Sequence, residues 1–169
     1  MKKLLVVFFV FILSFSIISF VQNKQDNLEN GFYYLAENEN DSKLVYDIDS
    51  EEVFGIEKTP ILTKHDFDDA YISTATIQST GKIDFKIIEI KLTNKGRKKW
   101  INVKSRIQKS NESIVFVFEN KVIIEKSFHG NSNNYNERIS LPISNKYAEN
   151  FLHKIKQEIE NYKFKNSKK

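Results

Sequence analysis

The segment Ser113–Phe128, SIVFVFENKVIIEKSF, constrains the fold of this chain more than any other stretch. Two runs rich in Val, Ile and Phe flank a polar pair, Asn120-Lys121, and this pattern predicts two strands joined by a turn. A hairpin this apolar is stable only with further strands or helices around it. We therefore expect the hairpin to lie at the centre of a sheet.

Other stretches rich in β-branched and aromatic residues supply the remaining strands. Phe32–Ala36 and Leu44–Ile48 flank a polar turn at residues 38–42 and predict a first hairpin. The segments AYISTATIQ and KIDFKIIEIKL predict a second pair, joined through Ser79-Thr80-Gly81. RISLPI, after the polar loop HGNSNNYNE, predicts a last short strand.

Three helices are expected between and after these strands. Thr63 and Asp66 fit a capping pair for a short helix that turns Phe67 and Ala70 inward. Thr93 caps a second helix, whose apolar residues Trp100, Val103 and Ile107 share one side.

Ser144 is expected to cap the final helix. Its apolar residues recur at steps of three and four, which predicts that it lies against the sheet; they are Tyr147, Phe151, Leu152, Ile155, Ile159 and Tyr162. The basic tail KFKNSKK is expected to fray. Together these elements predict an α+β fold, a mostly antiparallel sheet with about three helices, two of them packed on one face.

The N-terminus resembles an export signal. Lys2 and Lys3 precede 18 apolar and Ser residues, Leu4–Val21, with no Ala-x-Ala-like cleavage site after them. The run fits either a cleaved signal peptide or a retained membrane anchor, residues 1–21, and both place the rest of the chain outside the cytoplasm, in the periplasm or cell envelope. Residues 22–31 are expected to be a linker, and residues 32–165 a single α+β domain.

Composition excludes several kinds of chemistry. The 169-residue chain has no Cys, so it has no disulfide, thiolate ligand or cysteine nucleophile. Its net charge is +4, and +2 without Lys2 and Lys3, which is too little to predict nucleic-acid binding. Lys91–Lys109 does hold eight cations and no acid, which suits phosphate or anionic lipid, or else complements the ten acids between Asp26 and Glu57.

No catalytic, cofactor or metal residues are predicted. His65, His129 and His153 lie in different elements without a second ligand at metal spacing, and no phosphate-binding or nucleophile motif occurs. Asp66, Asp68 and Asp69 are the candidates for an acid pair, but their closeness on one predicted helix indicates a solvated cluster. The sequence thus favours a protein that is not an enzyme.

Four segments from about Phe54 onward resemble, in order, the head subdomain of the first periplasmic domain of SecD, a membrane component of protein export. They are TPILTKHDFDDA, EIKLTNKGRKKW with Gly96 and Trp100 at matching places, IVFVFENKVI, and RISLPISNKYAENFL. Asn120 stands where the family has a turn glycine, and Asn tolerates the same backbone conformation. The SecD-head-like part spans residues 54–163, without the spanning helices of the full translocase.

The resemblance implies a module that contacts secreted polypeptides or envelope proteins as an accessory to export. An exposed strand edge would bind an extended peptide by strand addition. The alternative is a structural or protein-interaction module of the cell envelope that has no part in secretion.

Overall fold

A computed structural model of the chain describes residues 28–36, 42–50, 52–77, 83–110, 112–126 and 137–168. The predicted signal or anchor, residues 1–21, lies outside the described residues. Among those described, no helix is both long and apolar enough to span a bilayer. The first strand begins at Gly31, the last residue of the range expected to be linker.

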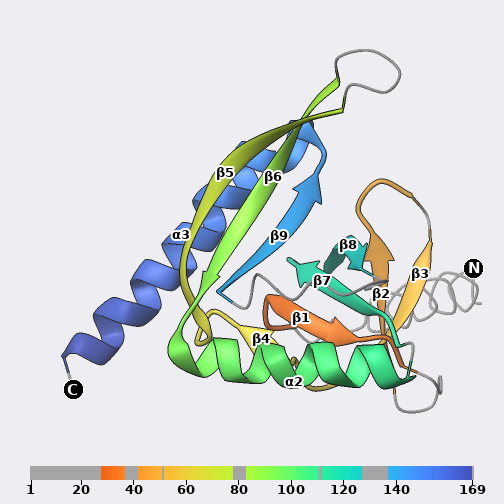
Figure 1. The fold of residues 1–169 in the computed structure, drawn as a ribbon, viewed down its shortest axis with the longest axis horizontal. Helices are drawn as coiled ribbons and strands as arrows, with labels where there is room; N and C mark the ends of the chain where they lie inside the picture. Colours follow the sequence, from red (N-terminus) through yellow and green to blue (C-terminus); the bar gives the residue numbers. More distant parts are fainter. Residues whose placement is uncertain are drawn as a thin grey trace, which may run out of the picture.

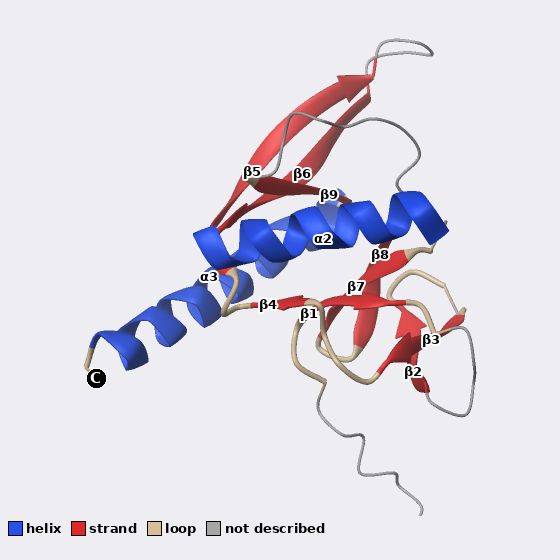
Figure 2. Ribbon diagram, turned by 60° about the horizontal axis from the view of Figure 1, so that its bottom comes forward, coloured by secondary structure: helices blue, strands red, loops and turns tan. Residues whose placement is uncertain are grey.

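The described residues form an α+β fold with nine strands and two helices. Figures 1 and 2 show how these elements are arranged. The elements in order are β1 (Gly31–Tyr34), β2 (Ser42–Asp47), β3 (Val53–Glu57), β4 (Leu62–Thr63), β5 (Phe67–Ile77), β6 (Ile83–Leu92), α2 (Asn94–Ser110), β7 (Ile114–Phe118), β8 (Lys121–Lys126), β9 (Arg138–Ile143) and α3 (Asn145–Ser167). They form two sheets where one was expected, in the orders β3-β2-β8-β7-β1-β4 and β5-β6-β9. Pairing is antiparallel except between β2 and β8, which confirms the mostly antiparallel α+β prediction.

The larger sheet curls until β1 meets β3. Leu35 bridges Ile56, and the N–H of Ala36 donates to Gly55 O at 2.9 Å. The enclosed side holds a small apolar cluster, which consists of Tyr33, Val45, Ile56, Val115, Val117 and Val122. Closure explains how these side chains are buried on the sheet face opposite the helices.

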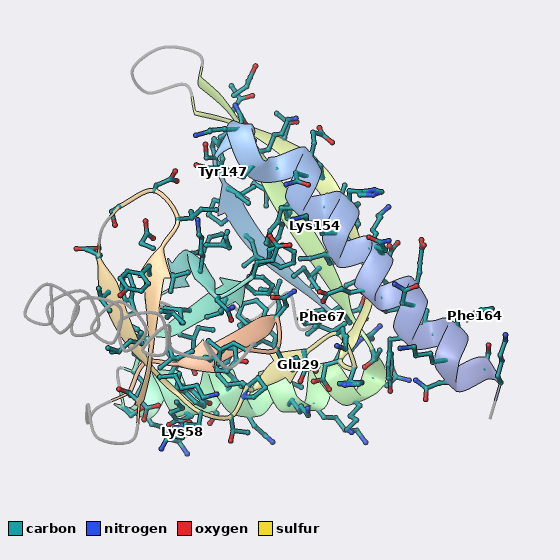
Figure 3. All side chains as sticks on the ribbon, turned by 180° about the vertical axis from the view of Figure 1, so that it is seen from behind. Glu29, Lys58, Phe67, Tyr147, Lys154 and Phe164 are labelled. Carbon is teal, nitrogen blue, oxygen red and sulfur yellow. The ribbon has the colours of Figure 1, made fainter. Side chains whose placement is uncertain are left out.

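The main core lies between the two sheets and both helices. Phe32 of β1 contacts Trp100 of α2 with ring centroids 5.7 Å apart, and Phe116 of β7 contacts Phe151 of α3 at 5.5 Å. Both helices therefore pack on the same face of the larger sheet. Figure 3 shows α3 from behind, crossing β5 and β6 of the smaller sheet, with Tyr147 near its beginning and Phe164 near its end.

The central hairpin is confirmed. Strands β7 and β8 occupy the middle of the six-stranded sheet, and all five residues of β7 are buried. Its turn is Glu119-Asn120, one residue earlier than predicted, with positive φ angles of 50° and 62°. Two positive φ angles in a two-residue loop are the signature of a type I′ hairpin turn, and Asn is among the residues that accept them.

The predicted first hairpin is wrong. β1 pairs with β4 and β7, whereas β2 pairs with β3 and β8. Both strands exist close to the expected positions, but each finds its partners elsewhere in the chain. Local patterning identifies a strand without identifying its neighbour.

The short helix predicted after Thr63 is also wrong. One of the two capping bonds exists, because Thr63 N donates to Asp66 Oδ2 at 3.2 Å, but Asp66 N donates to the backbone oxygen of Thr63 at 2.8 Å and not to its side chain. They close a turn that leads into β5 rather than a helix. Phe67 and Ala70 are both buried, as predicted, because a bulge at Asp68 shifts the strand register between them.

The two remaining helices are confirmed. Thr93 Oγ1 accepts the N–H of Gly96 at 3.0 Å, and Trp100, Val103 and Ile107 are buried. α3 begins after Ser144, although the Ser144 side chain makes no capping hydrogen bond. α3 continues through most of the basic tail to Ser167, so the fraying predicted for that tail is wrong up to that residue.

Candidate peptide-binding edge

The strand β5 is the longest of the described strands and forms one edge of the smaller sheet. It pairs with β6 along its length, and within the described part of the chain no strand lies on its other side. An edge strand presents a row of N–H and C=O groups that can pair with another extended chain. Whether this edge can pair depends on which of these groups are already bonded.

Alternate peptide groups of β5 point away from β6. In an antiparallel pair, successive residues alternate between bonding the neighbouring strand and facing outward. Ala70 N donates to Asp69 Oδ1 at 2.8 Å instead of to β6, which sets the alternation. By the same alternation, Ile72, Thr74 and Thr76 direct their N–H and C=O groups toward the outer edge.

The first half of this edge is occupied by side chains. Lys163 Nζ of α3 donates to Asp68 O at 2.6 Å and to its carboxylate at 3.1 Å. Lys91 Nζ lies 2.8 Å from the same carboxylate, and hydrogen bonds from Lys91 and Lys163 lower the pKa of Asp68. An ionised, paired carboxylate and a bulge at this position protect the edge from further pairing.

The second half of β5 has none of these protections. Its sequence from Ile72 to Ile77, ISTATI, contains no charged residue and no proline. Thr74 and Thr76 are exposed, and Thr76 Oγ1 donates to Asp84 of β6 at 2.6 Å. Short, uncharged and β-branched side chains favour strand pairing, so this half is the best candidate for strand addition.

The other sheet edges are less suitable. β4 is only two residues long, and β3 is partly covered by the bridge from Leu35. β9 contains Pro142, which has no N–H to donate. The hairpin β7–β8, although central to the sequence prediction, has neighbours on both sides and offers no edge.

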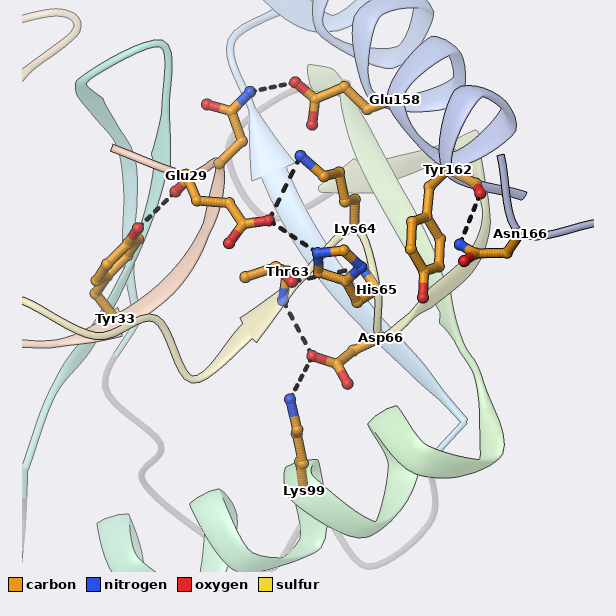
Figure 4. Close-up of polar contacts among 11 residues, drawn as sticks. Glu29, Tyr33, Thr63, Lys64, His65, Asp66, Lys99, Glu158, Tyr162 and Asn166 are labelled. Atoms are coloured by element: carbon orange, nitrogen blue, oxygen red, sulfur yellow. Dashed lines mark hydrogen bonds and ion pairs between the residues drawn. The ribbon is translucent and has the colours of Figure 1, made fainter. Parts of the chain in front are cut away.

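An ion pair with a buried carboxylate lies at the start of β5 (Figure 4). Asp66 is 0% exposed, and its Oδ2 accepts hydrogen bonds from Lys99 Nζ at 2.7 Å and from Thr63 N. Its backbone oxygen also accepts the N–H of Thr93, the cap of α2, at 2.9 Å. Asp66 therefore joins the turn before β5 to the beginning of α2.

A second set of polar contacts joins the same turn to the N-terminal segment and to α3. Glu29 lies 3.5 Å from Lys64 and 3.4 Å from His65. The His65 ring meets Tyr162 of α3 edge-on, with centroids 4.3 Å apart. Asn30 donates to Glu158 of α3 at 2.5 Å (Figure 4). These contacts connect the N-terminal segment, the turn before β5 and α3.

The three aspartates considered as an acid pair do not converge. Asp66 pairs with Lys99, Asp68 with two lysines, and Asp69 accepts the N–H of Ala70. They lie on a turn and a strand instead of a helix. Asp66 is buried rather than solvated, so the expected solvated cluster is wrong at that residue.

The histidines also lie apart. His65 belongs to the turn before β5, His153 is exposed on α3, and His129 falls outside the described residues. The described residues contain no group of three or more His, Cys, Asp or Glu side chains that could hold a metal ion.

The basic helix α2 pairs in part with acids from other elements. Lys99 contacts Asp66, Arg97 contacts Glu137 at 2.7 Å, and Arg106 contacts Glu57 at 3.4 Å. Glu57 belongs to the acidic first part of the chain. This pairing favours the interpretation that the basic helix complements that part.

No protein-family model, curated protein or solved structure matches the chain. The resemblance to the SecD head is a prediction from the four sequence segments.

Proposed function

We propose that this chain is an exported, non-enzymatic module, similar to the SecD head, that binds extended polypeptides along β5 as an accessory to protein export. The observation that carries the proposal is the uncharged second half of β5, where the N–H and C=O groups of Ile72, Thr74 and Thr76 face the outer edge. An incoming strand would gain main-chain hydrogen bonds there without requiring a particular sequence. The hydrophobic leader supports a position outside the cytoplasm, where such polypeptides emerge.

Site-specific photocrosslinking tests this role. A photoreactive residue at Thr76, in the full-length chain in detergent micelles, should form adducts with a reduced, carboxymethylated polypeptide that cannot fold. The same residue at Asn102, which is exposed on α2, is the matched control. Equal adduct yields at the two positions would count against binding at β5.

Two substitutions of Thr74 separate strand addition from general stickiness. Thr74→Pro removes an N–H that points outward, so it should abolish the adducts while the internal ladder with β6 stays intact. Thr74→Lys keeps the N–H and adds a charge of the kind that protects natural edges, so it should reduce the adducts. Undiminished adducts in both variants would refute the proposed site.

The competing role is an envelope scaffold unrelated to secretion. It is favoured by three apolar side chains exposed on neighbouring strands, Leu44 at 61%, Tyr46 at 53% and Val53 at 48%. Leu44 and Tyr46 share one face of β2, and Val53 lies opposite Tyr46 on β3. Co-purification from solubilised envelope distinguishes the roles, since translocation components support the first and unrelated envelope proteins the second.

A further inference from the structure

A pocket of about 290 Å³ lies on the face of the smaller sheet opposite the core, and Tyr71, Ser73, Glu89, Arg138 and Ser140 line it. These residues come from all three strands, since Tyr71 and Ser73 are on β5, Glu89 is on β6, and the other two are on β9. The pocket therefore begins at the strand whose edge is open. Glu89 is the only acidic residue among these lining residues.

The carboxylate of Glu89 is held between two hydroxyl groups. Ser73 Oγ donates to Oε1 at 3.3 Å, and Ser140 Oγ donates to Oε2 at 2.7 Å. Glu89 is half-buried on the central strand of its sheet. The two serines hold the carboxylate between β5 and β9, and its Oε1 side is directed toward β5.

Glu89 differs from the other buried or half-buried acids of this region in its partners. Asp66 and Asp68 each contact at least one lysine within 2.8 Å. Among the described residues, no Lys, Arg or His nitrogen forms an ion pair with Glu89. A half-buried carboxylate without a cation is costly, because hydroxyl donors do not balance its charge.

The alternation along β5 places an incoming side chain next to this carboxylate. Ser73 bonds β6, so the residue of an antiparallel incoming strand opposite Ser73 would form a non-hydrogen-bonded pair, the closer of the two types. Ser73 is small, and a side chain from the incoming strand can pass over it. The four-carbon stem of lysine is long enough to cross one strand spacing of about 4.8 Å.

We propose that the Glu89 pocket binds a lysine or arginine side chain of the polypeptide added to β5. The inference rests on the proposed strand addition and gives it a preference, namely a basic residue opposite Ser73. Tyr71 contributes an aromatic face beside the pocket, and the guanidinium of Arg138 already lies 5.4 Å from that ring. The positive charge of Arg138 repels incoming cations, so it disfavours a run of basic residues on the added strand.

Short fluorescent peptides of alternating Thr and Val test the preference by anisotropy with the full-length chain in detergent micelles. One central position carries Lys, Arg, norleucine or Glu. We expect the Lys and Arg peptides to bind about tenfold more tightly than the norleucine peptide, the size of one charge-assisted hydrogen bond. The Glu peptide should bind most weakly, and added salt should reduce the difference.

Substitutions assign the preference to the pocket. Glu89→Gln should bring the Lys peptide to the affinity of the norleucine peptide and leave the norleucine peptide unchanged. Ser73→Leu, which blocks the passage over β5, should do the same. Glu119→Gln removes an equivalent charge from the hairpin turn of the other sheet and should leave the preference intact.

The outcomes separate the two proposals. Equal binding of the Lys and norleucine peptides, both lost in Thr74→Pro, would overturn the Glu89 inference and leave strand addition standing. A Lys preference that survives Glu89→Gln would also overturn it. Binding of no peptide, or binding that Thr74→Pro does not affect, would overturn strand addition itself and the inference with it.

Discussion

Replacing Lys99 by Met should destabilise the fold far more than the same change at Lys98. Lys99 Nζ lies 2.7 Å from Asp66, whose side chain is 0% exposed. Lys98, the preceding residue of α2, is exposed. Removing one partner of a fully buried pair costs about 3–5 kcal/mol, because the remaining charge is uncompensated. The Lys99 side chain is 41% exposed, so solvent screening reduces our expectation to about 2–3 kcal/mol.

Urea unfolding at neutral pH measures this loss, and Lys98→Met should change the free energy of unfolding by less than about 0.5 kcal/mol. The double variant Asp66→Asn/Lys99→Met should recover part of the stability, since no charge is left buried. Equal, small losses in the two lysine variants would show that the contact with Asp66 contributes little and would refute the reasoning.

Three further predictions concern the helix start, a tyrosine and the protected half of β5. Gly96→Ala should lower the free energy of unfolding by about 1–2 kcal/mol in thermal unfolding, because an added Cβ would lie 2.3 Å from Asp66 O. The cost of this clash outweighs the gain of about 1 kcal/mol in helix propensity. Burial raises the pKa of Tyr33 from 10.0 to about 12. The contribution of Tyr33 to the free energy of unfolding is therefore present below pH 10 and is lost as the pH rises toward 12, by about 2.7 kcal/mol at most. Tyr33→Phe should remove this part of the pH dependence of unfolding. Lys163→Ala frees Asp68 O and should extend peptide crosslinks toward the first half of β5, whereas an unchanged crosslink pattern would show that Lys163 does not protect this edge.

Elements with a local signal were predicted well from the sequence. The hairpin β7–β8 follows from two apolar runs and an Asn that accepts positive φ, and α2 follows from Thr93 and the spacing of its buried residues. These features depend on residues within a few positions of one another. They hold because the tertiary fold agrees with the local preference.

The errors arose where a local signal has two solutions. The Asp66 carboxylate accepts the N–H of Thr63 as it would in a helix cap, yet here this bond closes a turn before a strand. The inward spacing of Phe67 and Ala70 fits a helix, but a bulge at Asp68 produces the same spacing in a strand. Only the pairing with β6, the next strand in the chain, decides between them.

The pairing of β1 could not be predicted for a similar reason. Phe32 lies opposite Phe116, 84 positions later in the chain. Strand partners depend on the register of the whole sheet, and nothing in either segment specifies the other. The same limit hid the candidate site, since Ser73, Glu89 and Ser140 meet only after three strands are aligned.

One sequence signal could have pointed to Glu89. It interrupts the apolar run of β6, FKIIEIKL, in a strand whose neighbours Ile88 and Ile90 are fully buried. A charged residue at the centre of such a strand must face the opposite side of the sheet, where it is either solvated or paired. The structure gives it hydroxyl partners and a pocket, and the pocket begins on β5 beyond the bulge at Asp68 that Lys163 contacts. The Lys163 contact and the position of Glu89 would together limit which residues of a bound strand could lie beside the pocket.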